Sequence, residues 1–304
     1  MRIRALIVSL VVIISFDMYS QIDTNKCKII LNENFCPKVL ELTENYTLTN
    51  LNNENTIYLI VDKKLKIFSE SNYGVLSAVV NEKEDKLAIS YFNGVVNIYD
   101  IKTSTLIKKI NEKSKVNSMV FYHEILYYGM DNGLVKSLNL TTNKEEQLAN
   151  HKDIIRGLLI KNNSLLSISQ NGILEVNSID KFLTESHRFF FNTIFTTIES
   201  SPDCSIIALG TFNGEIYILN NNFELSKTLE VHESIVTKLV FKNDSVLLSS
   251  SFDKKLYKTN IETSKKEILY ELQDYIMAFD FNDDKIILGG RNGRVEYHNF
   301  KCFN

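Results

Sequence analysis

The residues of this chain that could carry chemistry are its histidines and cysteines. The histidines are His123, His151, His187, His232 and His298, and no two stand in an H-E-x-x-H or similar metal-binding spacing. The cysteines are Cys27, Cys36, Cys204 and Cys302, and no two have the C-x-x-C spacing of a zinc site. The sequence therefore predicts no metal site.

Signatures of nucleophilic catalysis and phosphate binding are also absent from the sequence. It contains no G-x-S-x-G elbow, no P-loop and no G-x-G-x-x-G motif. Acidic pairs such as Asp283-Asp284 are typical of exposed loops. We therefore predict no catalytic residue and no cofactor, and an enzyme is the least favoured alternative. An active site would need polar side chains that converge from distant segments.

Composition indicates an ordinary globular protein that needs no metal or disulfide to build its core. Of the 304 residues, 44% are apolar and 23% are charged, and the formal net charge is −3. This charge argues against broad affinity for phosphate backbones. We expect other proteins as partners, with no specific signal for nucleic acid.

The first twenty residues allow two interpretations. Arg2 and Arg4 precede an apolar run from Ala5 to Phe16, which is the anatomy of a secretory signal and is too short to span a bilayer. The same run could instead form strands at the start of a β protein. The second interpretation predicts an intracellular protein, cytoplasmic or nuclear, and is favoured here. The first would place the protein in the secretory pathway.

A repeat in the sequence predicts the secondary-structure elements that position the histidines and cysteines. Asn-Gly recurs at Asn93-Gly94, Asn132-Gly133, Asn171-Gly172, Asn213-Gly214 and Asn292-Gly293, and Asp253-Lys254 fills the one gap. Measured at the second residue, successive steps are 39, 39, 42, 40 and 39 residues. A fixed period of this kind is the signature of a repeat architecture.

Each dipeptide lies between two β-like runs, as in Leu87–Ser90 and Val95–Tyr99 around Asn93-Gly94. This arrangement predicts a hairpin with a tight turn and positive φ at both central residues. Further apolar runs precede and follow each hairpin, so that every period holds four short strands. Four antiparallel strands per repeat describe a β-propeller blade, and the fold class is all-β.

The period predicts seven blades, with eight as the alternative. Six contain the turns above, and a seventh covers Thr47 to Tyr73, with a hairpin at Asp62-Lys63 and an outer strand that is short or lost. The last blade lacks a fourth strand after Phe300, and we expect Lys38–Leu42 to supply it, because an open edge is a liability. The domain prediction is an N-terminal segment, 1–37, and a single propeller, 38–304.

The sixth repeat resembles a WD-repeat unit. His232 precedes an apolar strand, Ser249 and Ser251 lie on the next strand, Asp253 stands at the hairpin, and Thr259-Asn260 takes the place of Trp-Asp. The resemblance implies a structural hydrogen-bond network of His232, Asp253 and one of the two serines. His151 is placed like His232. A faint resemblance to mitotic-checkpoint and mRNA-export propellers rests on Val120–His123, Gly129, Lys136, Leu140 and His151–Arg156.

A WD-repeat resemblance implies protein binding on the face that carries the hairpin turns, which we call the turn face. The residues just before each turn are the candidate anchors: Phe92, Asp131, Gln170, Phe212, Phe252 and Arg291. Aromatic and arginine side chains dominate interface hot spots. The alternative is that the phenylalanines pack as wedges between blades. We expect a non-enzymatic scaffold subunit of a larger intracellular assembly, or alternatively a secreted propeller that binds a surface ligand.

Overall fold

A computed structural model describes residues 28–32, 40–42, 47–50, 56–61, 64–179, 186–282, 285–291 and 294–299. These residues form strands joined by turns, and the all-β prediction is confirmed for them. None of them lies in a helix long and apolar enough to cross a membrane. The signal-like segment, residues 1–20, lies outside the described residues.

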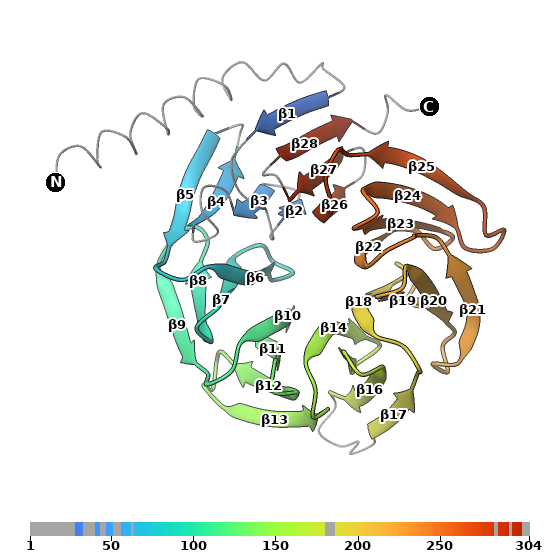
Figure 1. Cartoon of the computed structure of the whole chain (residues 1–304). Helices are drawn as coiled ribbons and strands as arrows, with labels where there is room; N and C mark the ends of the chain where they lie inside the picture. Colours follow the sequence, from blue (N-terminus) through green and yellow to red (C-terminus); the bar gives the residue numbers. More distant parts are fainter. Residues whose placement is uncertain are drawn as a thin grey trace.

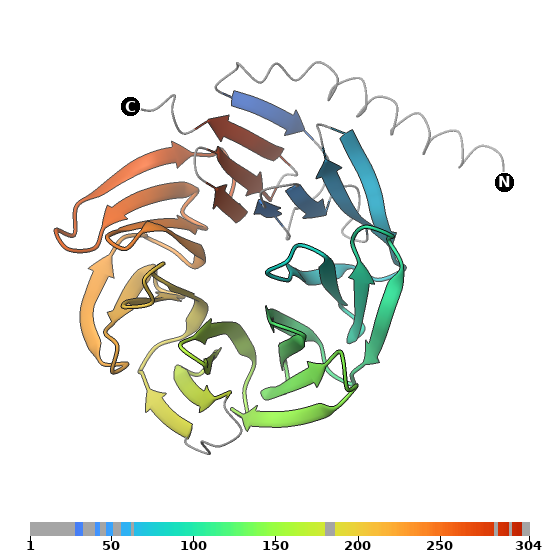
Figure 2. The same ribbon diagram turned by 180° about the vertical axis from the view of Figure 1, so that it is seen from behind.

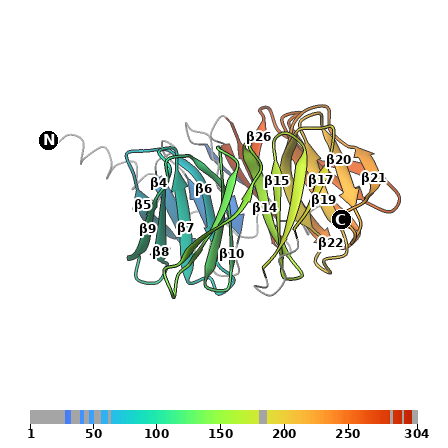
Figure 3. The same cartoon turned by 90° about the horizontal axis from the view of Figure 1, so that it is seen from below.

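The strands form seven four-stranded antiparallel sheets, which Figure 1 and Figure 2 show arranged around a common centre. Seen from the side, the sheets cross the thickness of a flat molecule (Figure 3). Six sheets use four consecutive strands each, and five of these, the regular sheets, lie between the ends of the described chain: β6 (Val75–Val80), β7 (Lys86–Tyr91), β8 (Val95–Asp100) and β9 (Leu106–Asn111); β10 (Val116–Tyr122), β11 (Ile125–Met130), β12 (Leu134–Asn139) and β13 (Glu145–Asn150); β14 (Ile155–Lys161), β15 (Ser164–Ser169), β16 (Ile173–Ser178) and β17 (Ser186–Phe190); β18 (Phe195–Ser200), β19 (Ile207–Thr211), β20 (Glu215–Leu219) and β21 (Leu225–Glu230); β22 (Val236–Asn243), β23 (Val246–Ser251), β24 (Lys255–Asn260) and β25 (Lys266–Glu271).

The other two sheets contain the ends of the described chain. One consists of β2 (Leu40–Leu42), β3 (Thr47–Asn50), β4 (Thr56–Val61) and β5 (Lys64–Glu70). The other consists of β26 (Ile276–Asn282), β27 (Lys285–Gly290), β28 (Arg294–Asn299) and β1 (Lys28–Asn32). β1 pairs antiparallel with β28, and β2 lies against β26 and β27 of the neighbouring sheet (Figure 1).

Two details of the sequence prediction are wrong at this junction. The strand that pairs with β28 is Lys28–Asn32 and not Lys38–Leu42, whose residues Leu40–Leu42 form the innermost strand of the next sheet. That sheet begins at Leu40 and has a full outer strand, β5, which is seven residues long. The described residues between Thr47 and Tyr73 form three strands, β3, β4 and β5, and Leu40–Leu42 supplies the fourth strand of the sheet by pairing with β3.

The second strands of the regular sheets are buried on both sides. In β7, β11, β15 and β23, every residue except the first is buried. Clusters of buried apolar side chains extend from one sheet to the next. Strands covered on both faces read as continuous apolar or small-residue runs, not as alternating patterns. This explains runs such as Leu247–Ser251, where three serines are fully buried.

The hairpin turns differ from the predicted type. In the first one, Gly94 N–H donates to Tyr91 O at 3.0 Å, with Phe92 and Asn93 as the central residues. Only the glycine has positive φ, with values from 80° to 92° at Gly94, Gly133, Gly172 and Gly214. This is a type I turn followed by a left-handed residue, which also matches the twist of a hairpin. Lys254 occupies the same position in the sixth repeat, at φ 73°.

Repeated hydrogen bonds place all these turns on one face. The turn face consists of the hairpin turns and the lead-in segments that precede the inner strands β6, β10, β14, β18, β22 and β26. The residue two positions before each turn glycine donates its N–H to the lead-in segment of its own sheet. Phe92 donates to Gly74 O in this way, and Phe212 donates to Ile194 O. Links between sheets, such as Thr196 Oγ1 to Val236 O at 2.7 Å, join neighbouring inner strands where they begin.

Candidate functional site

The first residue of each lead-in segment ties two sheets together. Its backbone N–H donates to the turn residue of the preceding sheet, in the pairs Glu112 to Gly94, His151 to Gly133, Phe191 to Gly172, His232 to Gly214 and Leu272 to Lys254. Its side chain belongs to the following sheet. The two histidines singled out by sequence therefore occupy one repeated structural position.

His232 has the hydrogen bonds that the WD-repeat resemblance implies. Nδ1 lies 2.8 Å from Asp253 Oδ2, and Nε2 lies 2.8 Å from Ser249 Oγ. Ser251 is not part of this contact, because its hydroxyl donates to Ser234 O. Burial would raise the pKa of Asp253, but its hydrogen bonds, the one from His232 foremost, hold that pKa below its ordinary value.

The sequence did not identify the aromatic partner of His232. Tyr257 packs edge-on against the imidazole, with ring centroids 5.0 Å apart. It lies opposite Ser249 on the neighbouring strand. Thr259, which stands where the family has tryptophan, is buried, and its hydroxyl has no hydrogen-bond partner. Tyr257 therefore covers the histidine from a position two residues earlier on β24.

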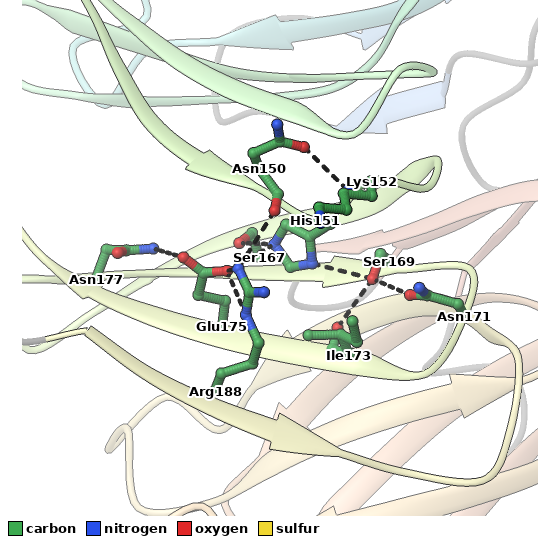
Figure 4. Close-up of polar contacts among 10 residues, drawn as sticks. All are labelled: Asn150, His151, Lys152, Ser167, Ser169, Asn171, Ile173, Glu175, Asn177 and Arg188. Atoms are coloured by element: carbon green, nitrogen blue, oxygen red, sulfur yellow. Dashed lines mark hydrogen bonds and ion pairs between the residues drawn. The ribbon is translucent and has the colours of Figure 1, made fainter.

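His151 lies in a second buried network, drawn in Figure 4. Nε2 is 2.7 Å from Ser167 Oγ and Nδ1 is 3.0 Å from Ser169 Oγ. Glu175 Oε2 lies 3.8 Å from Nε2 and accepts hydrogen bonds from Arg188 of the outer strand. Burial lowers the pKa of His151 to about 4, while Glu175 acts to raise it, so the ring is neutral at pH 7.

A serine hydroxyl held against an imidazole is the arrangement of a nucleophile and its general base. Here the side chain of His151 is fully buried, and Ser167 is fully buried as well. A substrate cannot reach either group in this conformation. The contact therefore serves the structure of the sheet.

The same repeated position holds different chemistry in other sheets. Glu112 accepts hydrogen bonds from Lys136 Nζ at 2.8 Å and from Tyr128 Oη at 3.0 Å. Phe191 packs against Phe195 and Tyr217. A polar network or an aromatic cluster can thus fill the position, which is the behaviour of a packing site. Among the described residues, no three His, Cys, Asp or Glu side chains gather in a way that could hold a metal ion.

The predicted anchors do lie together on the turn face, but their surroundings differ. Phe212 is 48% exposed and Phe92 is 36% exposed, with Lys115 Nζ 5.1 Å from the Phe92 ring centroid. Phe252 is half-buried and stacks on Tyr275, and the Arg291 guanidinium also lies over the Tyr275 ring. These three side chains form one cluster.

The remaining two predicted anchors are engaged by polar neighbours. Asn117 donates to Asp131, and Arg156 donates to Gln170. Both donors stand on inner strands directly after the lead-in segments.

Sequence reasoning missed the lead-in residues that flank the exposed phenylalanines. Tyr73 is 52% exposed and Ile194 is 41% exposed. Each lies beside an anchor, because Phe92 N–H donates to Gly74 O and Phe212 N–H donates to Ile194 O. The turn face thus carries an apolar pair on the β6–β9 sheet and another on the β18–β21 sheet. The period gave only an approximate signal for these residues, because the lead-in residue that accepts the hydrogen bond stands 18 residues before Phe92 and Phe212 but 16 before Asp131.

Comparison with solved structures decides the fold. A chain in the "Crystal Structure of Mitotic Checkpoint Complex" superposes with a TM-score of 0.80 at 14% identity, over 91% of this chain and 94% of that one. The chain has a WD40-like propeller fold. The computationally designed Ika8 protein is also similar, with a TM-score of 0.68 at 15% identity, over 88% of this chain and 97% of that one. No protein-family profile and no curated protein sequence matches this WD40-like propeller.

Proposed function

We propose that this WD40-like propeller is a non-enzymatic scaffold that binds protein partners through its turn face, as a subunit of a larger intracellular assembly. The observation that carries the proposal is the exposed apolar pair Phe212 and Ile194, held on rigid backbone by a hydrogen bond between them. Large apolar side chains at loop tips are costly to leave in water, and aromatic anchors dominate hot spots. The structurally similar chain from a multi-protein complex is consistent with this role.

The fold proposal is a closed ring of seven blades within a single domain. It is supported by seven four-stranded sheets, by the contact of β2 with β26 and by the pairing of β1 with β28. Pairing of an N-terminal strand with the last blade removes the open edge that the C-terminal sheet would otherwise present.

The test compares partner capture by the tagged wild-type protein with capture by two matched variants. Phe212→Ala removes the exposed anchor, whereas Leu225→Ala removes a side chain of similar exposure, 47%, at the outer strand β21. We expect partners identified by mass spectrometry to bind about thirtyfold more weakly to Phe212→Ala and equally well to Leu225→Ala. Equal capture by all three folded proteins would show that the partners bind at a surface other than the turn face.

The intracellular location is tested by the N-terminus of the native protein. An intact Met1 supports it. A mature end near residue 20 would instead place the protein in the secretory pathway and favour an extracellular ligand.

A further inference from the structure

The turn face carries an arc of exposed cations on two neighbouring sheets. Lys113 and Lys115 belong to the lead-in segment of β10, and Lys152 to that of β14, while Arg156 follows at the start of β14. All four residues are exposed. The two sheets are in direct contact through β10 and β14, and Asn117 of one donates to Ile155 O of the other. We call these four residues the basic arc.

The carboxylates near the basic arc are already engaged. Asp131 accepts a hydrogen bond from Asn117, and Asp153 accepts one from the N–H of Ile154. Glu112 is paired with Lys136 and Tyr128. The four exposed cations of the basic arc outnumber the two half-buried carboxylates, Asp131 and Asp153, so the arc keeps a net positive charge. On the β22–β25 and β26–β28 side of the turn face, exposed Glu233 and half-buried Asp274 balance Lys254 and Arg291.

Apolar side chains stand at both ends of the basic arc. Tyr73 and Phe92 lie on the sheet before it, and Ile194 and Phe212 lie on the sheet after it. The four sheets are consecutive around the centre, with β10 in contact with β6 and β14 in contact with β18 (Figure 1). The order along the face is therefore apolar, basic, basic, apolar. At one end the basic and apolar surfaces are in contact, because Lys115 Nζ lies over the Phe92 ring in a cation–π interaction.

We propose that this arc binds an acidic peptide segment of a partner protein, with apolar residues at each end of its carboxylate run. The inference rests on the proposed protein-binding function and names the chemistry of its partner. Glutamates or aspartates would meet the basic arc, and the flanking apolar side chains would contact the two exposed pairs. Complementary charge sets the register of such a segment and speeds its association.

A peptide fits these observations better than a nucleic acid. The cations cover only two sheets, and Asp131 and Asp153 stand among them. The chain as a whole carries a net charge of −3. A nucleic acid would extend its phosphates beyond the arc, where the residues that the structure describes form no continuous basic surface.

The experiment measures binding of a short fluorescein-labelled peptide by fluorescence polarisation. In the probe, glutamates and glycines alternate between two terminal phenylalanines, and a matched peptide has glutamine in place of every glutamate. The protein is the full chain, as wild type, as the double variant Lys115→Glu/Arg156→Glu, and as the control Lys102→Glu/Lys109→Glu. Both control residues are exposed: Lys102 lies in the turn between β8 and β9, at the opposite end of these strands from the turn face, and Lys109 lies on the outer strand β9.

We expect wild type and control to bind the glutamate peptide equally, and the arc variant to bind about tenfold or more weakly. Affinity for the wild type should also fall as salt is raised, which needs no variant. Equal binding of the glutamine peptide, unchanged affinity in a folded arc variant, or no binding of the glutamate peptide would overturn the inference. Tighter binding of single-stranded DNA than of the peptide would overturn it in favour of a nucleic acid.

The two proposals fail in different ways. If native partners are lost from Phe212→Ala while the glutamate peptide does not bind, the turn face binds proteins, but not through acidic segments. If Phe212→Ala keeps every partner, the proposed function itself is wrong.

Discussion

His151 is held neutral inside its sheet, and this has a measurable consequence. Burial lowers its pKa to about 4 in the folded protein, against an ordinary value near 6.5 in the unfolded chain. Between these two values the unfolded chain binds a proton that the folded protein does not. Stability is therefore lost as pH falls from about 6.5 to about 4, by about 3 kcal/mol.

The measurement is urea unfolding of wild type and His151→Gln at several pH values across this window. The variant should be less stable at pH 7 but should lack this loss at lower pH. Burial raises the pKa of Glu199 to about 7, which acts with the opposite sign over part of the window, so the difference between the two proteins is the quantity to compare. Parallel pH profiles would assign the titration to another group.

At the same scale, the sequence was a good guide to polar partners and a poor guide to packing. The spacing of a repeated motif predicted that His232 interacts with Asp253 and with one of two serines. In the structure the serine that contacts His232 is Ser249. The contact of Tyr257 with His232 was not foreseeable from that motif, since it places the aromatic residue two positions later. The exposure of Phe212 and the burial of Phe252 against Tyr275 depend on neighbours from other strands.

At the scale of the element, the turn glycines offer a matched pair of substitutions. A Cβ at Gly133 would meet the backbone nitrogens of Lys152 and Asp153 at 2.7 Å, and φ is +84° there. Gly133→Ala should therefore lower the free energy of unfolding by about 2 kcal/mol. Lys254 already adopts this left-handed conformation at φ 73°, so Lys254→Gly should raise stability by up to about 1 kcal/mol.

Thermal or urea unfolding of both variants tests the pair. Opposite signs are expected, because one substitution creates backbone strain and the other relieves it. A destabilising Lys254→Gly would mean that the lysine side chain makes a contact worth more than the strain.

Element positions were predictable for six of the sheets, because the 39- to 42-residue steps mark the hairpin between their second and third strands; the sheet of β2–β5 lies outside this series. The turn type was not, since an Asn-Gly pair suits both a two-residue turn and a type I turn with a following left-handed glycine. The observed turn places Phe92 and its equivalents at the tip, a point that depends on the hydrogen bond from Gly94 to Tyr91.

At the scale of the molecule, the pairing of β1 with β28 predicts the effect of truncation. Deleting residues 1–33 removes β1 and leaves β28 as an open edge. Tm should fall by roughly 5–10 °C, because a five-residue strand and its contacts are lost. Deleting residues 1–26 keeps β1 and serves as the control, with Tm unchanged. If both truncated proteins melt like the full chain, β1 contributes nothing to stability.

The sequence indicated that an N-terminal strand should complete the last sheet, but it did not identify which one. Lys28–Asn32 and Lys38–Leu42 are both short apolar runs, and period alone does not rank them. Leu40–Leu42 pairs with β3 as the innermost strand of the neighbouring sheet, which leaves Lys28–Asn32 to pair with β28. Which N-terminal strand joins which sheet therefore depends on both sheets together, and it cannot be predicted from the sequence of either strand alone.

Because β1 completes a sheet made of β26, β27 and β28, this sheet is assembled from two distant segments of the chain, which meet between its third and fourth strands. Every regular sheet has a turn at the equivalent place, between its third and fourth strands, which makes the WD40-like propeller a candidate for circular permutation. A chain that opens between Lys102 and Thr105, with the old termini joined by a flexible linker, would divide the β6–β9 sheet in the same way. Opening at 112–115 instead would cut beside Glu112, whose N–H holds the Gly94 turn. The first permutant should fold and melt near the wild type, and the second should not.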